Sequence, residues 1–306
     1  MPRVAVVGAT GAAGSVLRGL IKDWDDVRYF ASARSAGTQL DGRTVEEATP
    51  DALAAGGLDV CFFAVGASGS RELVPHAVRG GALCVDKSEA FRLRDGIPLV
   101  VPEVNGARAL EHHGIVANPN CCSIPLSLVL KPLHDEAGLR TVRVATYQSA
   151  SGKGARRLQQ LLDEPQAEHD LSADWDFDGE EFDEETKIRE ETRKILELPE
   201  LPLSATCVRV PVPVGHAESV WVETQEPLGA VRAREVLAAA PSVQVEDFPT
   251  PRAAAGGDEV LVGRIRPDRA GDGLSLHLAC DNLRKGAALN GIQIAELVLA
   301  QRRIAA

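Results

Sequence analysis

Two adjacent thiols, Cys121 and Cys122, follow Asn118-Pro119-Asn120 and precede an apolar run over residues 124–130. If that run opens a helix, both cysteines lie at its N-terminus, where the helix dipole favours thiolate over thiol. A thiolate can attack an acyl group and hold it as a thioester. The alternative is a pair of small buried apolar residues, because free cysteine commonly packs in protein cores. The other motifs of the chain favour the nucleophile.

A second candidate for chemistry is the segment from Arg209 to His216, which reads Arg-Val-Pro-Val-Pro-Val-Gly-His. A strand-like run through the prolines could bring both side chains to one cleft. A histidine can act as acid or base near neutral pH, and an arginine can bind a carboxylate through two hydrogen bonds. Taken alone, a surface arginine and a surface histidine would be the simpler interpretation.

Three further polar residues could bind a substrate. Gln148 ends a predicted strand in the run Tyr-Gln-Ser-Ala-Ser-Gly, where its amide could orient a carbonyl group or simply cap the strand. Glu184 and Lys187 are three positions apart and would share one face of a helix. An exposed ion pair is the alternative for these two, because the surrounding stretch 163–191 is very acidic and typical of a solvated face.

Three glycines, Gly8, Gly11 and Gly14, lie between the first strand candidate and the first helix candidate. Glycines in this position let the backbone approach a pyrophosphate, and the helix N-terminus offers N–H groups to it. A turn that merely connects two elements is the alternative, but the strand–loop–helix context favours nucleotide binding.

The residues after the second strand candidate, 27–31, indicate whether the loop would bind NAD or NADP. It carries no acidic residue that would bind a ribose 2′-hydroxyl, and instead continues as Ser32-Ala33-Arg34-Ser35. An arginine and serines suit a 2′-phosphate, so the sequence favours NADP over NAD. An ordinary surface arginine is the alternative.

The formal net charge of −11 argues against nucleic acid and against an anionic membrane surface as partners. The six cysteines show no paired metal-binding spacing, so we expect no metal site. We see no signal-peptide pattern, and no apolar stretch approaches the roughly 20 residues of a membrane span. With free thiols, these features predict a cytoplasmic protein.

These residues need two kinds of scaffold. In the first 120 residues, helix candidates at 15–22 and 71–79 alternate with short apolar runs at 4–7, 27–31, 60–65, 82–85, 99–101 and 115–117. Short, continuously apolar runs are typical of strands buried on both faces. The alternation predicts a parallel sheet wound by helices, which makes the fold class α/β.

Beyond Cys121 the pattern changes. Longer strand candidates, rich in valine and threonine, lie at 142–147, 205–210, 219–224 and 274–279. Helix candidates lie at 158–162, 184–196 and 233–240, and a final helix is expected over 290–304. This half predicts an antiparallel sheet in an α+β domain.

Nine segments occur in an order that resembles a known family along nearly the whole chain. They are GATGAAG, SARSAG, VVPEVN, ANPNCCSIP, TYQSASG, EETKIREETRKIL, ATCVRVPVPVGHAESVWVE, VGRIR and DNLRKGAALNGIQIAE. Together they resemble aspartate-semialdehyde dehydrogenase; the cysteine and Arg/His segments are specific to that family, whereas GATGxxG is shared more widely. The resemblance implies a Rossmann-type NADP-binding domain over 1–120, completed by the C-terminal helix within 281–306. It also implies a central α+β catalytic and dimerisation domain over 121–280.

The resemblance also implies a reaction, the NADPH-dependent reductive dephosphorylation of β-aspartyl phosphate to aspartate semialdehyde. This step belongs to lysine (through diaminopimelate), threonine and methionine biosynthesis. By resemblance, Cys121 forms the thioester, His216 is the acid/base and Gln148 orients the substrate. The substrate would be bound by Arg209 at its carboxylate, Glu184 at its amino group, and Arg92 and Lys187 at its phosphate. NADP would be contacted by Gly8, Thr10, Gly11, Ala12, Ala13, Arg34, Ser35, Ser151, Gly152 and Gln293. A homodimer or homotetramer is implied.

The chain departs from the family pattern in places that bear on the substrate. Lys87 and Glu89 replace residues usual beside the phosphate, Cys122 stands where serine is common, and the segment between Gln160 and Glu184 is shorter. A related acyl-phosphate reductase, such as one acting on N-acetyl-glutamyl phosphate, is therefore an alternative, although its motif resembles NPGCY. A catalytically silent NADP-binding paralogue is the other alternative, but none of its expected losses, at Cys121, Gln148, Arg209 or His216, is seen.

Overall fold

The computed structural model describes residues 2–164 and 175–305, and the chain divides into two compact units. The first unit comprises Met1–Pro119 with Ala287–Ala306, and the second comprises Asn120–Gly286. In the described residues, no helix combines the length and the apolar character that crossing a membrane requires.

The first unit is built on a seven-stranded sheet in the order β3-β4-β2-β1-β5-β6-β7. Every neighbouring pair is parallel except β3 with β4. The strands are β1 (Val4–Val7), β2 (Val27–Ala31), β3 (Gln39–Leu40), β4 (Arg43–Glu47), β5 (Val60–Phe63), β6 (Leu83–Asp86) and β7 (Ile115–Ala117). With β1 near the centre and later strands added on both sides, this is the arrangement of doubly wound nucleotide-binding sheets.

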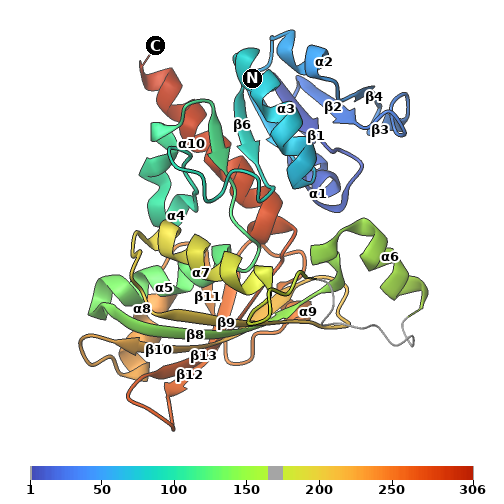
Figure 1. Ribbon diagram of the computed structural model, residues 1–306. Helices are drawn as coiled ribbons and strands as arrows, with labels where there is room; N and C mark the ends of the chain where they lie inside the picture. Colours follow the sequence, from blue (N-terminus) through green and yellow to red (C-terminus); the bar gives the residue numbers. More distant parts are fainter. Residues whose placement is uncertain (1, 165–174, 306) are drawn as a thin grey trace. The chain divides into compact units, whose positions relative to one another are not determined.

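Helices cover both faces of this sheet (Figure 1). Helix α1 (Ala12–Leu20) links β1 to β2, and α3 (Ala67–Arg79) links β5 to β6 on the other side of the centre. Because right-handed crossovers in opposite directions use opposite faces, α1 and α3 lie on different faces. The last helix, α10 (Leu289–Ala305), packs with α1, and Leu17 and Ile292 from these helices join Val6 of β1 in one core. The remaining helices are α2 (Pro50–Ala54), α4 (Pro102–Asn105) and η1 (Gly106–Glu111).

The second unit is built on a six-stranded sheet in the order β11-β12-β13-β10-β8-β9. The pairs from β12 through β8 are antiparallel, whereas the edge pairs β8–β9 and β11–β12 are parallel. The strands are β8 (Leu139–Gln148), β9 (Leu203–Arg209), β10 (His216–Thr224), β11 (Val243–Val245), β12 (Val260–Pro267) and β13 (Leu274–Cys280).

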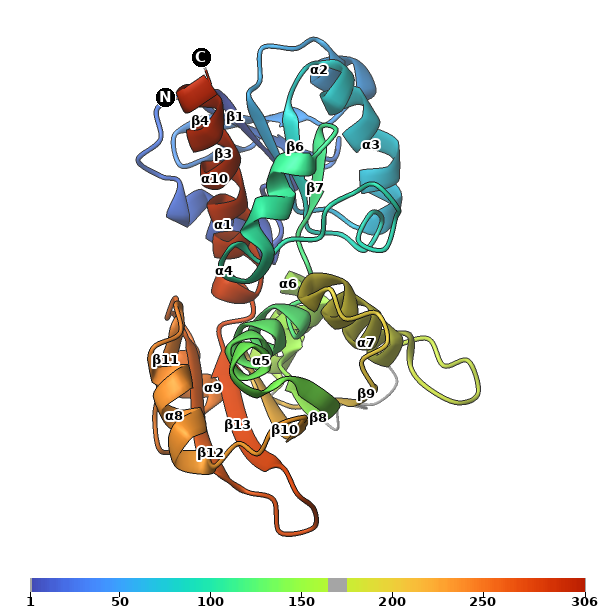
Figure 2. The ribbon, with the colours of Figure 1, turned by 90° about the vertical axis from the view of Figure 1, so that its left-hand side faces the viewer.

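Helices α5 (Ser123–Ala137), α7 (Asp183–Leu196) and α8 (Ala230–Ala238) cover one face of this sheet, here called the inner face (Figure 2). Strand residues alternate between the two faces, so Val144 and Val220 point inward and are buried, while Arg143 and Trp221 point outward. The opposite face of the sheet, here called the outer face, is not covered by α5, α7 or α8. Short helices η2 (Ala150–Lys153), α6 (Ala155–Asp163), α9 (Pro251–Ala254) and η3 (Arg284–Ala288) complete the unit or join it to α10.

The α/β fold class predicted from the sequence is confirmed, and most of the predicted elements are present. Two expectations need correction, and four strands were missed. Residues 99–101 form only an isolated bridge from Leu99 to Ala117 rather than a strand. The second sheet is not wholly antiparallel, because α7 carries the chain back across the sheet between β8 and β9 and so makes them parallel. Strands β3, β4, β11 and β12 were not predicted, and two of them, β3 and β11, are too short to leave a periodic signal.

Candidate active site

Cys121 lies in the turn that leads into helix α5, as the apolar run after it predicts. The side chain of Asn120 shapes this turn, because its Oδ1 accepts a hydrogen bond from the N–H of Cys122 at 2.8 Å. Cys121 is partly exposed, whereas Cys122 is fully buried. Burial raises the pKa of the Cys122 thiol well above its usual range, so Cys122 stays protonated and Cys121 is the candidate nucleophile.

His216 begins strand β10 and faces Cys121, with its Nε2 3.2 Å from the Sγ of that residue. Its other ring nitrogen, Nδ1, accepts a hydrogen bond from the backbone N–H of Ser149 at 3.0 Å. Because a backbone N–H can only donate, Nδ1 is unprotonated and the proton of the neutral imidazole is on Nε2. The arrangement therefore directs an N–H at the Cys121 sulfur, which stabilises a thiolate.

The tautomer of His216 also helps to decide whether the residues around Cys121 could bind a metal ion. In the described part of the chain, one group of side chains offers three metal-ligand atoms close together, namely Cys121, Cys122 and His216. A histidine that binds a metal through Nε2 needs its proton on Nδ1, where it would meet the Ser149 N–H. The hydrogen bonds therefore suit a thiolate nucleophile better than a metal centre.

Ser149 and Asn282 hold the histidine in this orientation. The Ser149 hydroxyl lies 3.1 Å from both His216 Nδ1 and Asn282 Oδ1. Asn282 Oδ1 also accepts the backbone N–H of Gly215 at 2.9 Å, directly before the histidine. Neither Ser149 nor Asn282 was predicted as a site residue. Asn282 belongs to the motif DNLRKGAALNGIQIAE, and this membership was the feature of the sequence that could have identified it as a site residue.

Gln148 and Arg209 end strands β8 and β9 and are direct neighbours in the parallel register of the two strands. Both side chains are buried on the inner face. Gln148 Nε2 lies 3.1 Å from Glu184 Oε1, and the same oxygen accepts a hydrogen bond from Asn120 Nδ2 at 2.9 Å. The amides of Gln148 and Asn120 thus converge on one carboxylate from helix α7. A second acid from that helix, Glu191, accepts the backbone N–H of Asn120 at 2.6 Å.

Arg209 and His216 border the same small space. Arg209 is 3% exposed, and its Nη1 donates a hydrogen bond to the carbonyl oxygen of Ser149 at 3.1 Å. A Cβ atom added at Gly152 would come within 2.9 Å of Arg209 Nη1 and 3.1 Å of His216 Nε2. The missing side chain at Gly152 therefore leaves room beside both groups. The structure thus brings Cys121, Gln148, Glu184, Arg209, His216, Ser151 and Gly152 together within the second unit.

Two predicted phosphate-binding residues lie in other surroundings. Lys187 is half-buried, and its Nζ contacts Asp183 Oδ2 at 2.6 Å. It is less buried than Glu184, which lies one helical turn before it. Arg92 belongs to the first unit, where its guanidinium donates hydrogen bonds to the carbonyl oxygens of Asn118 and Lys87.

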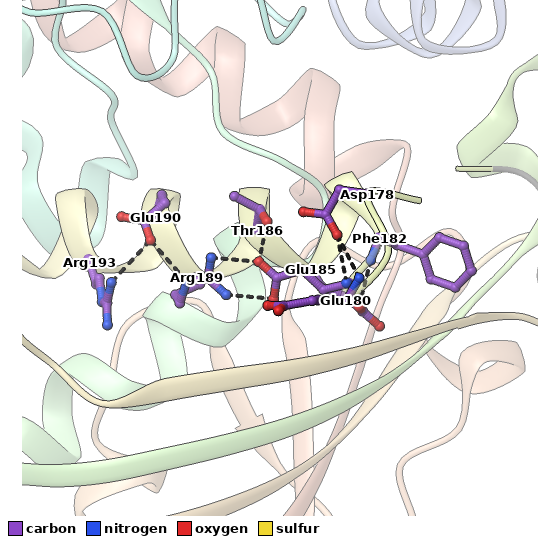
Figure 3. A network of polar contacts seen from close by, with 9 residues as sticks. Asp178, Glu180, Phe182, Glu185, Thr186, Arg189, Glu190 and Arg193 are labelled. Carbon is purple, nitrogen blue, oxygen red and sulfur yellow. Dashed lines mark hydrogen bonds and ion pairs between the residues drawn. The ribbon is translucent and has the colours of Figure 1, made fainter. Parts of the chain in front are cut away.

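The helix that carries Glu184 is fixed at its N-terminus by its own acidic residues (Figure 3). Glu185 Oε2 accepts the backbone N–H of Phe182 at 2.9 Å, while its Oε1 accepts that of Cys207 in β9 at 2.8 Å. Arg189 forms two hydrogen bonds to Glu181 at 2.7 Å. The acidic stretch is thus partly a structural anchor for α7 and not only the solvated face that its composition predicted.

Glu218 was not singled out in the sequence, yet it lies within this cluster. It follows His216 by two residues on β10 and so faces inward on the same side, where it is fully buried and the thiol of Cys122 is its neighbouring polar group. Burial, followed by the neighbouring charge of Cys121, raises the pKa of the Glu218 carboxyl well above its usual range. Burial therefore favours the neutral form of the Glu218 carboxyl.

We expect Glu218→Gln to raise thermal stability increasingly as the pH rises. A carboxyl whose folded pKa is raised binds more protons in the folded state than in the unfolded state above about pH 4.3. Its contribution to stability therefore falls from that pH up to the raised pKa, and glutamine removes this loss. The measurement is the difference in Tm between variant and wild type from pH 5 to 8, with the exposed Glu226→Gln as control. A difference that does not change with pH would contradict a raised pKa of the Glu218 carboxyl.

The nucleotide-binding candidates lie in the first unit. Gly8 has a φ of +91° and ends β1, and a Cβ atom there would lie 2.5 Å from the carbonyl oxygen of Ala64. Gly11 caps α1 without a side-chain hydrogen bond, so the first-turn N–H groups, those of Ala12 and Ala13 among them, are not covered by a capping side chain. Thr10 is exposed beside them. This loop has the donors that a pyrophosphate requires.

Arg34 and Ser35 lie in the turn that follows β2, at the same carboxyl edge of the sheet. Arg34 is exposed and Ser35 is half-buried. Their position at the end of the strand next to β1 is the one where a 2′-phosphate would lie. Gln293 of α10 lies elsewhere in the unit, 3.3 Å from Glu103 through its Nε2.

The chain is similar over nearly its whole length to proteins of known function. Residues 3–112 match the family model "Semialdehyde dehydrogenase, NAD binding domain", and residues 130–285 match "Semialdehyde dehydrogenase, dimerisation domain". The aspartate-semialdehyde dehydrogenase of Streptomyces akiyoshiensis is 44% identical over 338 aligned residues, covering 98% of this chain and 99% of the relative. Because the alignment is longer than the 306 residues here, the relative carries residues that this chain lacks.

Two solved structures are also similar. Aspartate semialdehyde dehydrogenase II from Vibrio cholerae, crystallised in complex with ASA, gives a TM-score of 0.91 at 35% identity and 98% coverage of both chains. Aspartate semialdehyde dehydrogenase with NADP from Candida albicans gives a TM-score of 0.81 at 25% identity and 99% coverage of both chains.

Proposed function

The chain belongs to the semialdehyde dehydrogenase family, and we propose on that premise that it is an NADP-dependent aspartate-semialdehyde dehydrogenase. It reduces β-aspartyl phosphate to aspartate semialdehyde and releases phosphate, a step of amino-acid biosynthesis. The observation that carries the proposal is the 3.2 Å contact between Cys121 Sγ and His216 Nε2, beside Gln148 and Arg209.

The first step is the attack of the Cys121 thiolate on the acyl carbon of β-aspartyl phosphate. The bond from sulfur to carbon forms, the bond from carbon to the phosphate oxygen breaks, and phosphate leaves with the electron pair. His216 directs its Nε2–H at this sulfur, so it stabilises the thiolate beforehand and the carbonyl oxygen during attack. The product is a thioester on Cys121.

The substrate is held by the charged and amide groups around the cysteine. Arg209 binds the carboxylate in the space left by Gly152. Glu184 binds the amino group through its second oxygen, because Oε1 already accepts from Gln148 and Asn120. Gln148 orients the acyl group. The family resemblance assigns the phosphate to Arg92 and Lys187, and Lys187 would have to give up its contact with Asp183 to bind it.

The first unit fits NADP, because uncapped N–H groups at the start of α1 and the exposed Arg34 lie at one edge of its sheet. Gly8, Gly11 and residues 10–13 would hold the pyrophosphate, and Arg34 with Ser35 the 2′-phosphate. The family resemblance names Ser151, Gly152 and Gln293 as further contacts of the cofactor. When bound, the reduced nicotinamide supplies the hydride that converts the thioester to the aldehyde. Cys121 then leaves as a thiolate, which His216 again stabilises.

The test runs the reaction in reverse with aspartate semialdehyde, phosphate and NADP, following the absorbance of NADPH. We expect turnover that requires phosphate. Arg34→Ala is expected to lower the preference for NADP over NAD by about 10- to 100-fold, since a hydrogen bond to a charged group contributes roughly 1.5–3 kcal/mol. An unchanged preference would remove Arg34 from the cofactor site. Turnover with N-acetyl-glutamate semialdehyde instead would establish the related reductase.

We further infer that the protein works as a homodimer joined through the outer face of the second sheet. The matching dimerisation domain covers this sheet. The outer face carries Trp221 at its centre, beside a hollow of about 580 Å³ that also touches Ala145 and Thr206. Arg143, Glu223 and Asp268 also line this hollow, so an aromatic side chain lies within a charged rim, as in many protein interfaces. The measurement of oligomeric state described next also distinguishes a homodimer from a homotetramer.

We expect Trp221→Glu to weaken the dimer at least about 30-fold, because a buried aromatic anchor contributes 2 kcal/mol or more. Analytical ultracentrifugation of wild type and variant measures this. Val231→Glu is the control, since Val231 is 76% exposed on α8, which lies on the inner side. A wild-type monomer, or a variant as dimeric as the wild type, would contradict the interface.

We place the enzyme in the cytoplasm because its chemistry depends on a free thiol. No disulfide bond joins any two of the six cysteines. Reducing compartments preserve such thiols.

A further inference from the structure

Trp175 lies over the guanidinium group of Arg209. The Cζ atom of Arg209 is 4.6 Å from the centroid of the tryptophan ring. Trp175 is half-buried, whereas Arg209 is almost completely buried. This distance is within the range of a cation–π contact, and the desolvation of the arginine strengthens it.

A short, tightly bonded turn fixes the tryptophan. Asp183 donates its backbone N–H to the carbonyl of Asp176 at 2.9 Å, and Phe177 forms a bridge with Phe182. The Phe182 ring lies 5.9 Å from the Trp175 ring and supports it. These contacts join the tryptophan to the anchored start of α7.

The same turn is secured by its charged groups (Figure 3). Asp178 Oδ1 accepts the backbone N–H groups of Glu180 and Glu181, both at 2.9 Å. Hydrogen bonds from Arg189, and then from Thr186, hold the pKa of the Glu181 carboxyl at about 2. The ion pair therefore persists throughout the neutral pH range, and the turn presents Trp175 in a defined position.

The contacts of Arg209 show what the tryptophan contributes. One side of the guanidinium faces the aromatic ring, and Nη1 donates to the Ser149 carbonyl. The space at Gly152 adjoins Arg209 Nη1 and the His216 ring. An arginine held in this way has its plane fixed before a carboxylate arrives, which lowers the entropy lost on binding.

We infer that Trp175 is a positioning residue that orients Arg209 for the substrate carboxylate and shields that contact from water. The inference rests on the proposed function, since it concerns the substrate that Arg209 binds. Trp175 lies in the segment between Gln160 and Glu184, and its ring covers one face of the Arg209 guanidinium.

The test compares Trp175→Ala and Trp175→Phe with wild type in the reverse reaction with aspartate semialdehyde, phosphate and NADP. We expect alanine to raise the KM for aspartate semialdehyde about 10- to 30-fold, and to leave kcat within about twofold. Phenylalanine, which keeps an aromatic face, should restore most of the affinity. The KM for phosphate should not change. Trp24→Phe in the first unit is the matched control.

Tryptophan fluorescence gives a second readout that does not depend on turnover. Adding aspartate semialdehyde should change the tryptophan fluorescence of wild type and of Trp24→Phe, but not that of Trp175→Phe. The phenylalanine variant therefore tests the position of Trp175 even if the alanine variant does not fold. An unchanged KM in Trp175→Ala, a loss confined to kcat, or a full response in Trp175→Phe would overturn the inference while leaving the proposed function intact. A wild type without turnover on aspartate semialdehyde would overturn both.

Discussion

Replacing Cys121 with alanine is expected to lower kcat by about 10⁴-fold or more, because the reaction has no covalent route without the thiolate. The expectation rests on one partly exposed sulfur 3.2 Å from a ring N–H, at the start of a helix. The measurement is phosphate-dependent NADPH formation from aspartate semialdehyde. Circular dichroism and Tm of the variant show that the loss is chemical.

Cys122→Ala is the matched control for this prediction. Its sulfur is fully buried, and burial raises the pKa of its thiol, so it is neither accessible nor ionised. The control should retain activity within about tenfold, the loss reflecting packing. Limited alkylation followed by mass spectrometry should modify Cys121 first. If Cys122→Ala abolished turnover and Cys121→Ala did not, the nucleophile assignment would be reversed.

Replacing His216 with alanine is expected to lower kcat by about 10²- to 10³-fold, the loss typical of removing one preorganised donor from a site of developing charge. The backbone N–H of Ser149 keeps Nδ1 unprotonated, so His216 acts through its Nε2–H. The variant should also hold less thiolate at neutral pH, which the ultraviolet absorbance of the thiolate measures. The two readouts together separate the loss of a donor from a change in fold.

His216→Gln distinguishes a hydrogen-bond donor from a titrating acid or base. A glutamine amide can donate toward the Cys121 sulfur, but it does not exchange a proton near neutral pH. We expect this variant to be about tenfold more active than His216→Ala. Equal activity of the two would show that His216 works by gaining and losing a proton. His113→Gln, at an exposed position of the first unit, is the control.

The parts of the fold that were predictable are those whose signal is local. Val4–Val7 is continuously apolar and is followed by glycines and a helix, and that pattern has few other structural solutions. The position of Cys121 before α5 followed from an apolar run after a polar turn. The edge strands β3 and β11 span two and three residues, so no periodicity could reveal them.

The contacts within the site were less predictable, because they depend on strand register. Gln148 and Arg209 are neighbours only because β8 and β9 pair in parallel after α7 crosses between them. Glu218 became visible as a buried acid only once β10 was placed under α5. Trp175 over Arg209 joins an acidic loop to a strand end, and neither segment alone indicates the other.

The sequence by itself determined the chemistry that is available: a thiol at a helix start, a histidine and an arginine seven residues apart, and a glycine loop after a strand. Residue type and short-range spacing encode these features, because they follow from local backbone geometry. Only the tertiary structure decided which nitrogen of His216 carries the proton, which carboxylate Gln148 meets, and what covers Arg209. Those choices depend on hydrogen bonds and packing between segments many residues apart, which long-range strand pairing fixes and local sequence does not.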